Sequence, residues 1–291
     1  MQQFKGTGVA LVTPFNNDLS LDLGGLSRVI EYAIEGGVDY LVILGTTAEN
    51  ATLTEAEKQQ VIKKSIEVTA GRVPLMLGVG GNNTAYIIQT LKTRDLSAFD
   101  GILSVSPYYN RPTQAGIYAH YQAVSEASPL PIMAYNVPAR TGSNLLPETV
   151  LKLGNDFKNI FGIKEAAGDM VQMLRLLKDK PADFMVVSGD DMLALPTVSA
   201  GGEGVISVIG QGMPKEFTAM INQGLKGELK KAYKNHYSLM PLIDLIFSEG
   251  NPAGIKALLA QKGICNAAVR LPLVAASDEL NKKIATYLKG L

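Results

Sequence analysis

Eight short apolar stretches, each followed by a longer amphipathic segment, run through the first three quarters of this chain. Valine, leucine and isoleucine fill these stretches almost continuously, which is typical of parallel strands covered on both faces. Eight repeats of strand and helix favour an α/β fold with a closed (β/α)₈ TIM barrel, whose usual size of about 250 residues fits this chain. The predicted strands are Gly8–Thr13, Tyr40–Gly45, Pro74–Gly80, Gly101–Pro107, Pro131–Val137, Ile160–Lys164, Phe184–Ser188 and Gly204–Val208.

Helical periodicity fills the gaps between these strands, and several helices carry start signals. Thr54 with Glu57 makes a capping box, and Asp22 and Thr113 are placed to cap two other helices. A doubly wound open sheet is the alternative, but Gly78–Asn83 lacks the last glycine of the dinucleotide-binding fingerprint and indicates a strand end. The predicted helices are Leu23–Glu35, Glu55–Ala70, Thr84–Ser97, Gln114–Ala127, Pro147–Leu153, Met170–Lys178, Met192–Ala200 and Lys215–Gln223.

After about Gly224 the alternation stops and only helical patterns follow. We therefore expect a barrel over residues 1–224 and a C-terminal helical appendage over 225–291, packed on the barrel. No linker rich in proline, glycine or serine separates the two parts, so independent motion is not expected. The predicted tail helices are Glu228–Met240, Pro241–Ser248, Pro252–Lys262 and Ser277–Lys289.

The composition excludes several classes of function. Twenty-seven basic residues balance 27 acidic ones, so no overall charge indicates nucleic acid or an anionic membrane as partner. The N-terminus lacks a signal-peptide pattern, and no apolar run is long enough to span a bilayer. Cys265, the single cysteine, permits no intrachain disulfide and agrees with the cytoplasmic location that we expect. His120 and His236 lie in no ligand-like cluster, so we expect no metal site.

Lys164 ends the sixth predicted strand, where a charged side chain is unusual because burying an unpaired ammonium is costly. One interpretation is a structural lysine that pairs with Glu165 or Asp190, or whose ammonium reaches solvent. The other is an amine nucleophile that forms an imine, which requires an apolar slot that discourages its charge. The lysine taken alone leaves both interpretations open. Asp169 is placed as the N-cap of the next helix.

Catalytic groups in such a barrel come from the carboxyl ends of the strands and the loops that follow them. Gly201–Gly204 precedes the last strand, at the opposite end, and is interpreted as a turn rather than a phosphate-binding loop. The unusual polar residues instead gather at the carboxyl rim: Thr46, Thr47, Tyr108, Tyr109, Tyr135, Arg140, Lys164, Gly189 and Asp190.

Each of these rim residues also has a purely structural interpretation. Thr46 and Thr47 could merely turn the backbone, or their hydroxyls and N–H groups could hold a carboxylate. Tyr135 could be a core tyrosine or a proton shuttle beside the strand of Lys164. Arg140 could be a surface charge or a fork for a carboxylate. Their joint placement around one lysine favours a functional site.

The rim motifs resemble those of the dihydrodipicolinate synthase/N-acetylneuraminate lyase family of class I aldolases. The resemblance covers the whole barrel, and the helical tail is also of the family's kind. Ala48 departs from it, because the family usually has glycine there and alanine tightens the turn. The matching segments are Gly45–Glu49, Ser106–Asn110, Tyr135–Gly142, Gly162–Ala166, Ser188–Asp191 and Gly204–Val208.

Within this family the resemblance is closest to the synthase branch, which forms 4-hydroxy-tetrahydrodipicolinate from pyruvate and L-aspartate 4-semialdehyde in lysine and diaminopimelate biosynthesis. Thr46 stands where the lyases tend to have serine, and Arg140 where they usually carry an apolar residue. One alternative is a cleaving aldolase of the family that acts on a sialic acid or a 2-keto-3-deoxy sugar acid. Another is a barrel that only binds a keto acid as a sensor or scaffold, against which Lys164, Tyr135 and Thr47 argue.

The resemblance also implies residue roles. Lys164 forms a Schiff base with pyruvate, and protons move along Tyr135, Thr47 and Tyr109, with Tyr109 reaching in from a neighbouring subunit of a homodimer or homotetramer. No metal or organic cofactor is needed, because the lysine imine activates the substrate. The implied substrate-binding residues are Thr46, Thr47, Arg140, Gly189 and the backbone carbonyl of Ile206.

Regulated members of the family bind lysine at the dimer interface, where a carboxylate holds the α-ammonium. Tyr86 stands here where that acidic partner is expected, and Lys58 adds a cation beside a ligand that already carries two. Glu55 could substitute only by turning toward the ligand, so we expect weak or absent inhibition. The matching positions are Asn50, Ala51, Glu55, Lys58, Asn82, Tyr86 and Tyr108.

Overall fold

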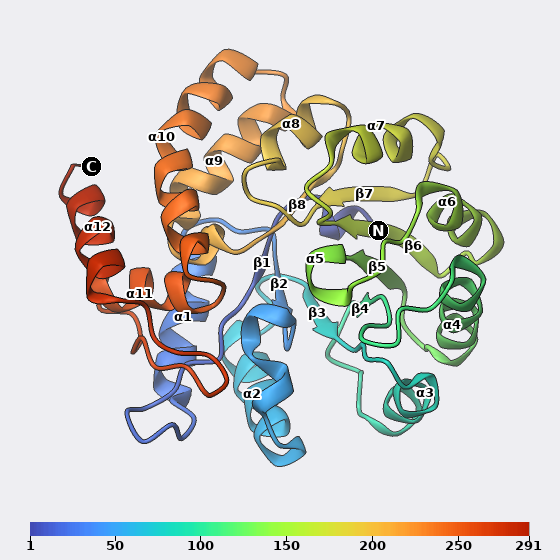
Figure 1. Cartoon of the computed structure of the whole chain (residues 1–291), viewed down its shortest axis with the longest axis horizontal. Helices are drawn as coiled ribbons and strands as arrows, with labels where there is room; N and C mark the ends of the chain where they lie inside the picture. Colours follow the sequence, from blue (N-terminus) through green and yellow to red (C-terminus); the bar gives the residue numbers. More distant parts are fainter. Residues whose placement is uncertain (291) are drawn as a thin grey trace.

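Eight parallel strands form a closed barrel in the order β1 to β8, with β1 paired to β8. The computed structural model describes residues 1–290, confirms the predicted TIM barrel and excludes the open sheet (Figure 1). The strands are β1 (Gly6–Ala10), β2 (Tyr40–Ile43), β3 (Leu75–Gly78), β4 (Gly101–Val105), β5 (Ile132–Asn136), β6 (Ile160–Glu165), β7 (Met185–Ser188) and β8 (Gly204–Ser207).

The predicted helices cover the outside of this barrel, and the predicted caps form. The Asp22, Thr113 and Asp169 side chains each accept a backbone N–H, and Thr54 with Glu57 completes the capping box. The helices are α1 (Leu23–Glu35), α2 (Glu55–Thr69), α3 (Thr84–Thr93), α4 (Gln114–Ala127), α5 (Pro138–Thr141), α6 (Pro147–Asp156), α7 (Met170–Asp179), α8 (Ala194–Ser199), α9 (Pro214–Leu225), α10 (Leu229–Ser248), α11 (Ala253–Gln261) and α12 (Asp278–Lys289).

One prediction for the tail is wrong, because the two helices expected on either side of Pro241 form the single helix α10. An internal proline costs roughly 3 kcal/mol through its missing N–H and its clash with the preceding turn. The helix continues because one face stays apolar on both sides of the proline, with Leu239, Leu242 and Ile243 buried. Each such side chain contributes about 1.5–3 kcal/mol on burial, so together they outweigh the cost of the proline.

A short N-terminal turn that the sequence did not predict fills the amino end of the barrel. This turn, η1 (Gln2–Phe4), inserts the fully buried ring of Phe4 between two rings at the beginnings of strands. The Tyr40 ring meets it edge-on at 5.3 Å between centroids, and the Phe161 ring stacks on it at 5.5 Å. The amino end is therefore packed with aromatic side chains, which leaves the carboxyl end for a cavity.

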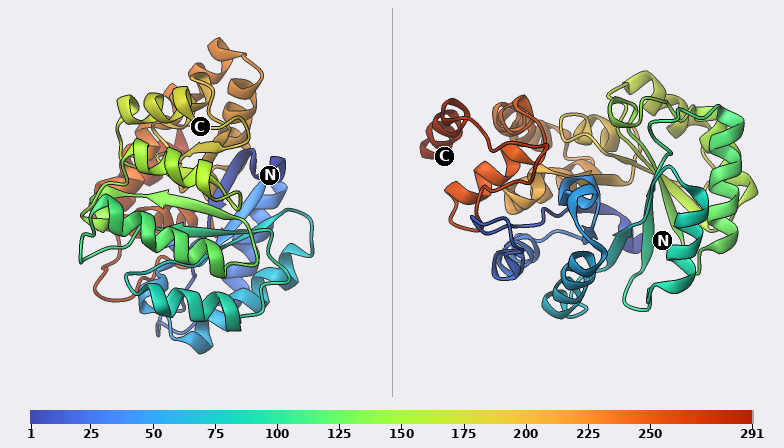
Figure 2. Two further views of the ribbon diagram at one scale, coloured as in Figure 1. Left: turned by 90° about the vertical axis from the view of Figure 1, so that its right-hand side faces the viewer. Right: turned by 60° about the horizontal axis from the view of Figure 1, so that its bottom comes forward.

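The tail helices lie together on one side of the barrel, as Figure 1 and the right-hand view of Figure 2 show. The α10 helix packs along α9, and both α11 and α12 pack on α10. The predicted boundary at residue 224 falls in the last turn of α9, and the division into two parts stays a prediction; residue 291 lies outside the described residues. Over residues 1–290, no helix is long and apolar enough to cross a membrane.

A buried histidine gives the fold a predictable response to acid. The His120 ring on α4 has its Nδ1 atom 2.8 Å from the Thr84 hydroxyl, and its Nε2 atom has no partner within residues 1–290. Burial lowers the pKa of His120 to about 4. This value lies below the pKa of a histidine in the unfolded chain, which is about 6.5. The contribution of the neutral His120 ring to stability is therefore complete above about pH 6.5 and is lost as the pH falls toward 4.

We expect His120→Asn to remove most of this acid sensitivity, because the amide keeps an acceptor for Thr84 but does not titrate. Between pH 7 and pH 4 the free energy of unfolding of the wild type should fall by up to about 3 kcal/mol more than that of the variant. Urea unfolding at each pH measures the difference. Identical pH profiles for the two proteins would contradict this assignment.

Candidate active site

Lys164 lies in β6 with its side chain inside the carboxyl end of the barrel. The residue is 5% exposed, and the strand register places it beside Tyr135 of β5 and Val187 of β7. Its ammonium lies 4.4 Å from the centre of the Tyr135 ring. No carboxylate within residues 1–290 lies within ion-pair distance of the ammonium, so the predicted structural pairing with Glu165 or Asp190 does not form.

The carboxylate of Glu165 is bound elsewhere. It accepts hydrogen bonds from the Asn136 side chain at 3.0 and 3.1 Å, from the Gln172 side chain at 2.9 Å and from the Ala167 N–H at 2.7 Å. Burial raises the pKa of Glu165, and these donors partly offset that rise. The network fixes the end of β6 from the outside of the barrel, while Lys164 lies inside it.

Gly189 gives Lys164 the room that its side chain occupies. A Cβ atom at this position would lie 2.8 Å from Lys164 Cε and 2.7 Å from the Cβ of Ala166, closer than side chains approach one another. The neighbouring Asp190 accepts hydrogen bonds from the N–H groups of Met192 and Leu193. Gly189 therefore contacts the lysine, whereas Asp190 serves the local backbone.

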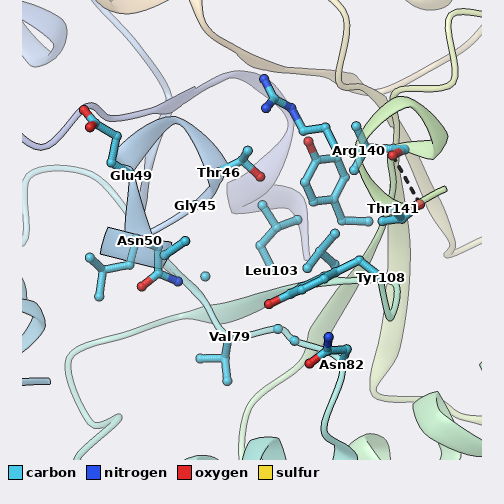
Figure 3. A pocket seen from close by; sticks show the side chains of 18 of the residues that line it. Gly45, Thr46, Glu49, Asn50, Val79, Asn82, Leu103, Tyr108, Arg140 and Thr141 are labelled. Atoms are coloured by element: carbon cyan, nitrogen blue, oxygen red, sulfur yellow. Dashed lines mark hydrogen bonds between the residues drawn. The ribbon is translucent and has the colours of Figure 1, made fainter. Parts of the chain in front are cut away.

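A cavity of about 500 Å³ opens at this rim. Thr46, Tyr108, Tyr135 and Arg140 belong to its lining, so the structure brings together four of the predicted rim residues. In Figure 3, Thr46 and Arg140 lie on one side of the cavity and Asn82 on the other, with Leu103 between them. Lys164 itself is not part of the lining and lies against the Tyr135 ring.

The two adjacent threonines differ in their surroundings. Thr46 begins the short helix η2 (Thr46–Ala48) and lines the cavity, whereas Thr47 is 3% exposed and lies outside the lining. The Thr47 hydroxyl accepts a hydrogen bond of 2.9 Å from the side chain of Asn251. The same asparagine offers its backbone carbonyl to the Arg140 guanidinium at 3.4 Å. Asn251 thus contacts two predicted site residues, although it was not itself predicted from the sequence.

The predicted proton relay is not joined within this subunit. Among residues 1–290, no direct hydrogen bond connects Tyr135, Thr47 and Tyr109. The Tyr109 side chain is 84% exposed, and its backbone is in the left-handed region with φ of 71°. The relay therefore stays a prediction, as does the role of Tyr109 in a neighbouring subunit.

A buried carboxylate holds the end of β8, the strand that contains Ile206, and the loop that follows it. Asp191 accepts hydrogen bonds from the Ser207 hydroxyl at 2.6 Å and from the Ile209 N–H at 2.8 Å. Burial raises the pKa of Asp191 to about 6, which these donors partly oppose. The Ile206 side chain packs in the barrel interior, and the contact of its carbonyl with substrate stays a prediction.

Six of the seven positions matched to the lysine site line the large cavity, and Tyr86 also lines a smaller neighbouring one. Glu55 lies at a neighbouring cavity of about 240 Å³, outside the lining of the large one. Its carboxylate binds the Lys58 ammonium and the Arg94 guanidinium, both at 2.7 Å, and the Tyr86 hydroxyl at 3.1 Å. The other six positions all line the large cavity: Asn50, Ala51, Lys58, Asn82, Tyr86 and Tyr108.

Residues that commonly bind metal ions are dispersed in the described part of the chain. Over residues 1–290, histidine, cysteine, aspartate and glutamate form no group of three or more that could hold a metal ion. The absence of a metal and of an organic cofactor from the reaction stays a prediction.

Cys265 is buried, and burial raises the pKa of its thiol to about 11, which agrees with a structural role.

Comparison with known proteins gives consistent matches over the full chain. A sequence model of the Dihydrodipicolinate synthetase family matches residues 3–291. The 4-hydroxy-tetrahydrodipicolinate synthase of Flavobacterium psychrophilum is 56% identical over 291 residues, which is 100% of this chain and 99% of the relative.

Solved structures agree with this match. The dihydrodipicolinate synthase of Thermotoga maritima superposes with a TM-score of 0.96 at 40% identity, over 99% of this chain and 98% of that one. A protein described as the first monomeric dihydrodipicolinate synthase variant also gives a TM-score of 0.96 at 40% identity, over 99% and 96% of the two chains.

Proposed function

The chain belongs to the Dihydrodipicolinate synthetase family, and on this premise we propose that it is a 4-hydroxy-tetrahydrodipicolinate synthase of lysine and diaminopimelate biosynthesis. It is a class I aldolase-type lyase that condenses pyruvate with L-aspartate 4-semialdehyde. The observation that carries the proposal is Lys164, an amine buried at the barrel rim beside Tyr135 with no carboxylate to hold its charge within residues 1–290.

Lys164 is the nucleophile. Its amine attacks the ketone carbon of pyruvate, and loss of water leaves a protonated imine. This imine withdraws electrons from the methyl group, which therefore loses a proton. The adduct of Lys164 and pyruvate is then an enamine. The enamine carbon attacks the aldehyde carbon of the second substrate. The amino group of that substrate then closes the ring and displaces Lys164.

In this mechanism, hydroxyl groups at the barrel rim hold the keto acid and move protons. Thr46 and Thr47 bind the pyruvate carboxylate through hydroxyl and N–H groups, and Tyr135, Thr47 and Tyr109 form the relay. Because the Thr47 hydroxyl accepts a hydrogen bond from Asn251, its own hydrogen is free to be donated to another acceptor. Tyrosine alone is a weak base near neutral pH, so a chain of hydroxyls is the reasonable route.

The second substrate brings its own carboxylate, for which Arg140 is the partner. The guanidinium is exposed at the cavity, and its one hydrogen bond within residues 1–290 is the long one to the Asn251 carbonyl. A planar fork of donors suits a carboxylate better than it suits the uncharged chain of a sugar acid. Arg140 thus favours the synthase over the sugar-acid aldolase. Gly189 and the Ile206 carbonyl complete the substrate contacts.

Trapping with borohydride and pyruvate tests the proposed function. The wild type should gain the mass of a reduced pyruvate adduct on Lys164, and Lys164→Ala and Lys164→Arg should gain none, because a guanidinium stays charged and forms no imine. A coupled assay with aspartate semialdehyde then separates synthase from aldolase. Failure to trap the wild type would overturn the imine mechanism, and retro-aldol cleavage of sugar acids alone would favour the aldolase.

We also propose that the enzyme self-associates as a homodimer or homotetramer and works in the cytoplasm. A tyrosine that is 84% exposed in a left-handed backbone conformation is costly in an isolated subunit, and a neighbouring subunit would bury it. One of its structural relatives is described as monomeric, so association needs its own test.

Mixing two inactive variants tests a shared site. Lys164→Ala and Tyr109→Phe should each be inactive alone. Hybrids of the two should recover activity, because some sites then contain Lys164 of one subunit and Tyr109 of the other. Mass spectrometry confirms the subunit exchange. Exchange without recovered activity would show that each site is built from one chain.

We propose, further, that lysine inhibits weakly or not at all. The Glu55 carboxylate is already paired with Lys58 and Arg94 outside the large cavity, and the Glu49 carboxylate accepts hydrogen bonds from Lys256 and Arg270. Neither is free to hold the α-ammonium of a ligand. Calorimetric titration and inhibition assays with lysine measure the outcome. Half-inhibition below about 1 mM, a binding free energy of roughly −4 kcal/mol or better, would contradict this proposal.

A further inference from the structure

A buried ion pair joins the helical tail to the loop that carries the two threonines. Lys256 of α11 and Glu49 lie 2.5 Å apart, and their side chains are 0% and 1% exposed. The ammonium also donates to the Ala268 carbonyl at 2.8 Å and lies 4.2 Å from the centre of the Phe15 ring. The second carboxylate oxygen of Glu49 accepts the Arg270 N–H at 2.8 Å. Both charges are thus paired and hydrogen-bonded away from water.

Glu49 lies where the catalytic loop changes direction. Its backbone has φ of 53°, in the left-handed region that a residue other than glycine rarely adopts. Its N–H donates to the Thr46 carbonyl at 3.2 Å, and its own carbonyl accepts the Thr52 N–H at 2.9 Å. Holding the Glu49 side chain therefore holds the end of the turn formed by Thr46 and Thr47.

The same part of the tail also holds Thr47 directly. Asn251, two residues before α11 begins, donates to the Thr47 hydroxyl. On the other side of the turn, the Thr13 hydroxyl donates to the Ala48 carbonyl at 2.8 Å. The turn is thus fixed by polar contacts from the tail and from the loop after β1, and the ion pair is the only one of these contacts in which both groups are charged.

We propose that Lys256 and Glu49 are positioning residues, which act through the loop backbone to aim the Thr46 and Thr47 groups at the keto-acid carboxylate. The inference rests on the proposed function and adds two residues to it. A fully buried ion pair is often replaceable by apolar side chains without loss of stability, so stability alone does not account for its place beside the cavity. Its geometry, with both partners fixed by further hydrogen bonds, suits the task of holding a loop.

The chain offers a matched control at the opposite end of the barrel. Lys180 and Glu203 form a largely buried pair at 2.6 Å, with side chains 16% and 21% exposed. The Glu203 carboxylate also accepts the Val186 N–H, so this pair too ties a loop to a strand. None of its residues lines the cavity. The Lys180–Glu203 pair thus has the same chemistry as the Lys256–Glu49 pair but lies away from the cavity.

The experiment compares Lys256→Met with Lys180→Met, because methionine keeps most of the volume and removes the charge. At a temperature where both variants are folded, Lys256→Met should raise KM for pyruvate and slow borohydride trapping about tenfold, the effect of losing roughly one charged hydrogen bond. KM for the semialdehyde should change much less. Lys180→Met should lower Tm and leave both constants unchanged.

An unchanged KM for pyruvate in folded Lys256→Met, or an equal change in Lys180→Met, overturns the inference. Where Lys256→Met does not fold, Glu49→Asp replaces it, because aspartate keeps the charge and withdraws the carboxylate by one methylene. This variant should show the same rise in KM for pyruvate, and its absence would equally overturn the inference. Trapping of the wild type separates the two levels: an untrapped wild type contradicts the proposed function, whereas a trapped wild type with an unaltered variant contradicts only the inference.

Discussion

The alternation of side chains along β6 is the constraint on which the site depends. Successive residues of a strand point to opposite faces, so Lys164 enters the barrel while Glu165 faces the helices outside. The nearest carboxylate in the sequence is therefore separated from the lysine by the sheet itself, and Asn136 and Gln172 bind it there. A carboxylate partner would hold the amine in its charged form, and the strand prevents that pairing without any further device.

Closure of the barrel then determines which groups meet Lys164. Because all eight strands are parallel, their carboxyl ends share one rim, and residues more than a hundred positions apart become neighbours. Tyr135 comes from the adjacent strand and Gly189 from the loop after the next one. The opposite end is packed with Phe4, Tyr40 and Phe161, and the cavity opens at the carboxyl rim.

The barrel and the rim residues were predictable because both follow from local patterns. Buried parallel strands read as continuous apolar runs, and polar residues at their ends stand out against those runs. The continuity of α10 through Pro241 was not predictable, because it depends on the apolar face that α9 buries. Asn251 and Lys256 were missed for a related reason: their partners Thr47 and Glu49 lie 204 and 207 residues away. A lysine inside the apolar segment 253–259 was the one available signal.

These long-range contacts change how the tail is understood. An appendage that merely covered the barrel would need only an apolar interface. Such an interface tolerates small shifts of the two surfaces against each other. The tail instead contacts the loop that carries Thr46 and Thr47 with an amide and a buried ammonium, groups that are costly to bury unless their partners are in place. Directional contacts of this kind fix the position of the loop that they hold. The segment that leads into α11 therefore contributes to the candidate site, since Asn251 and Pro252 line the cavity.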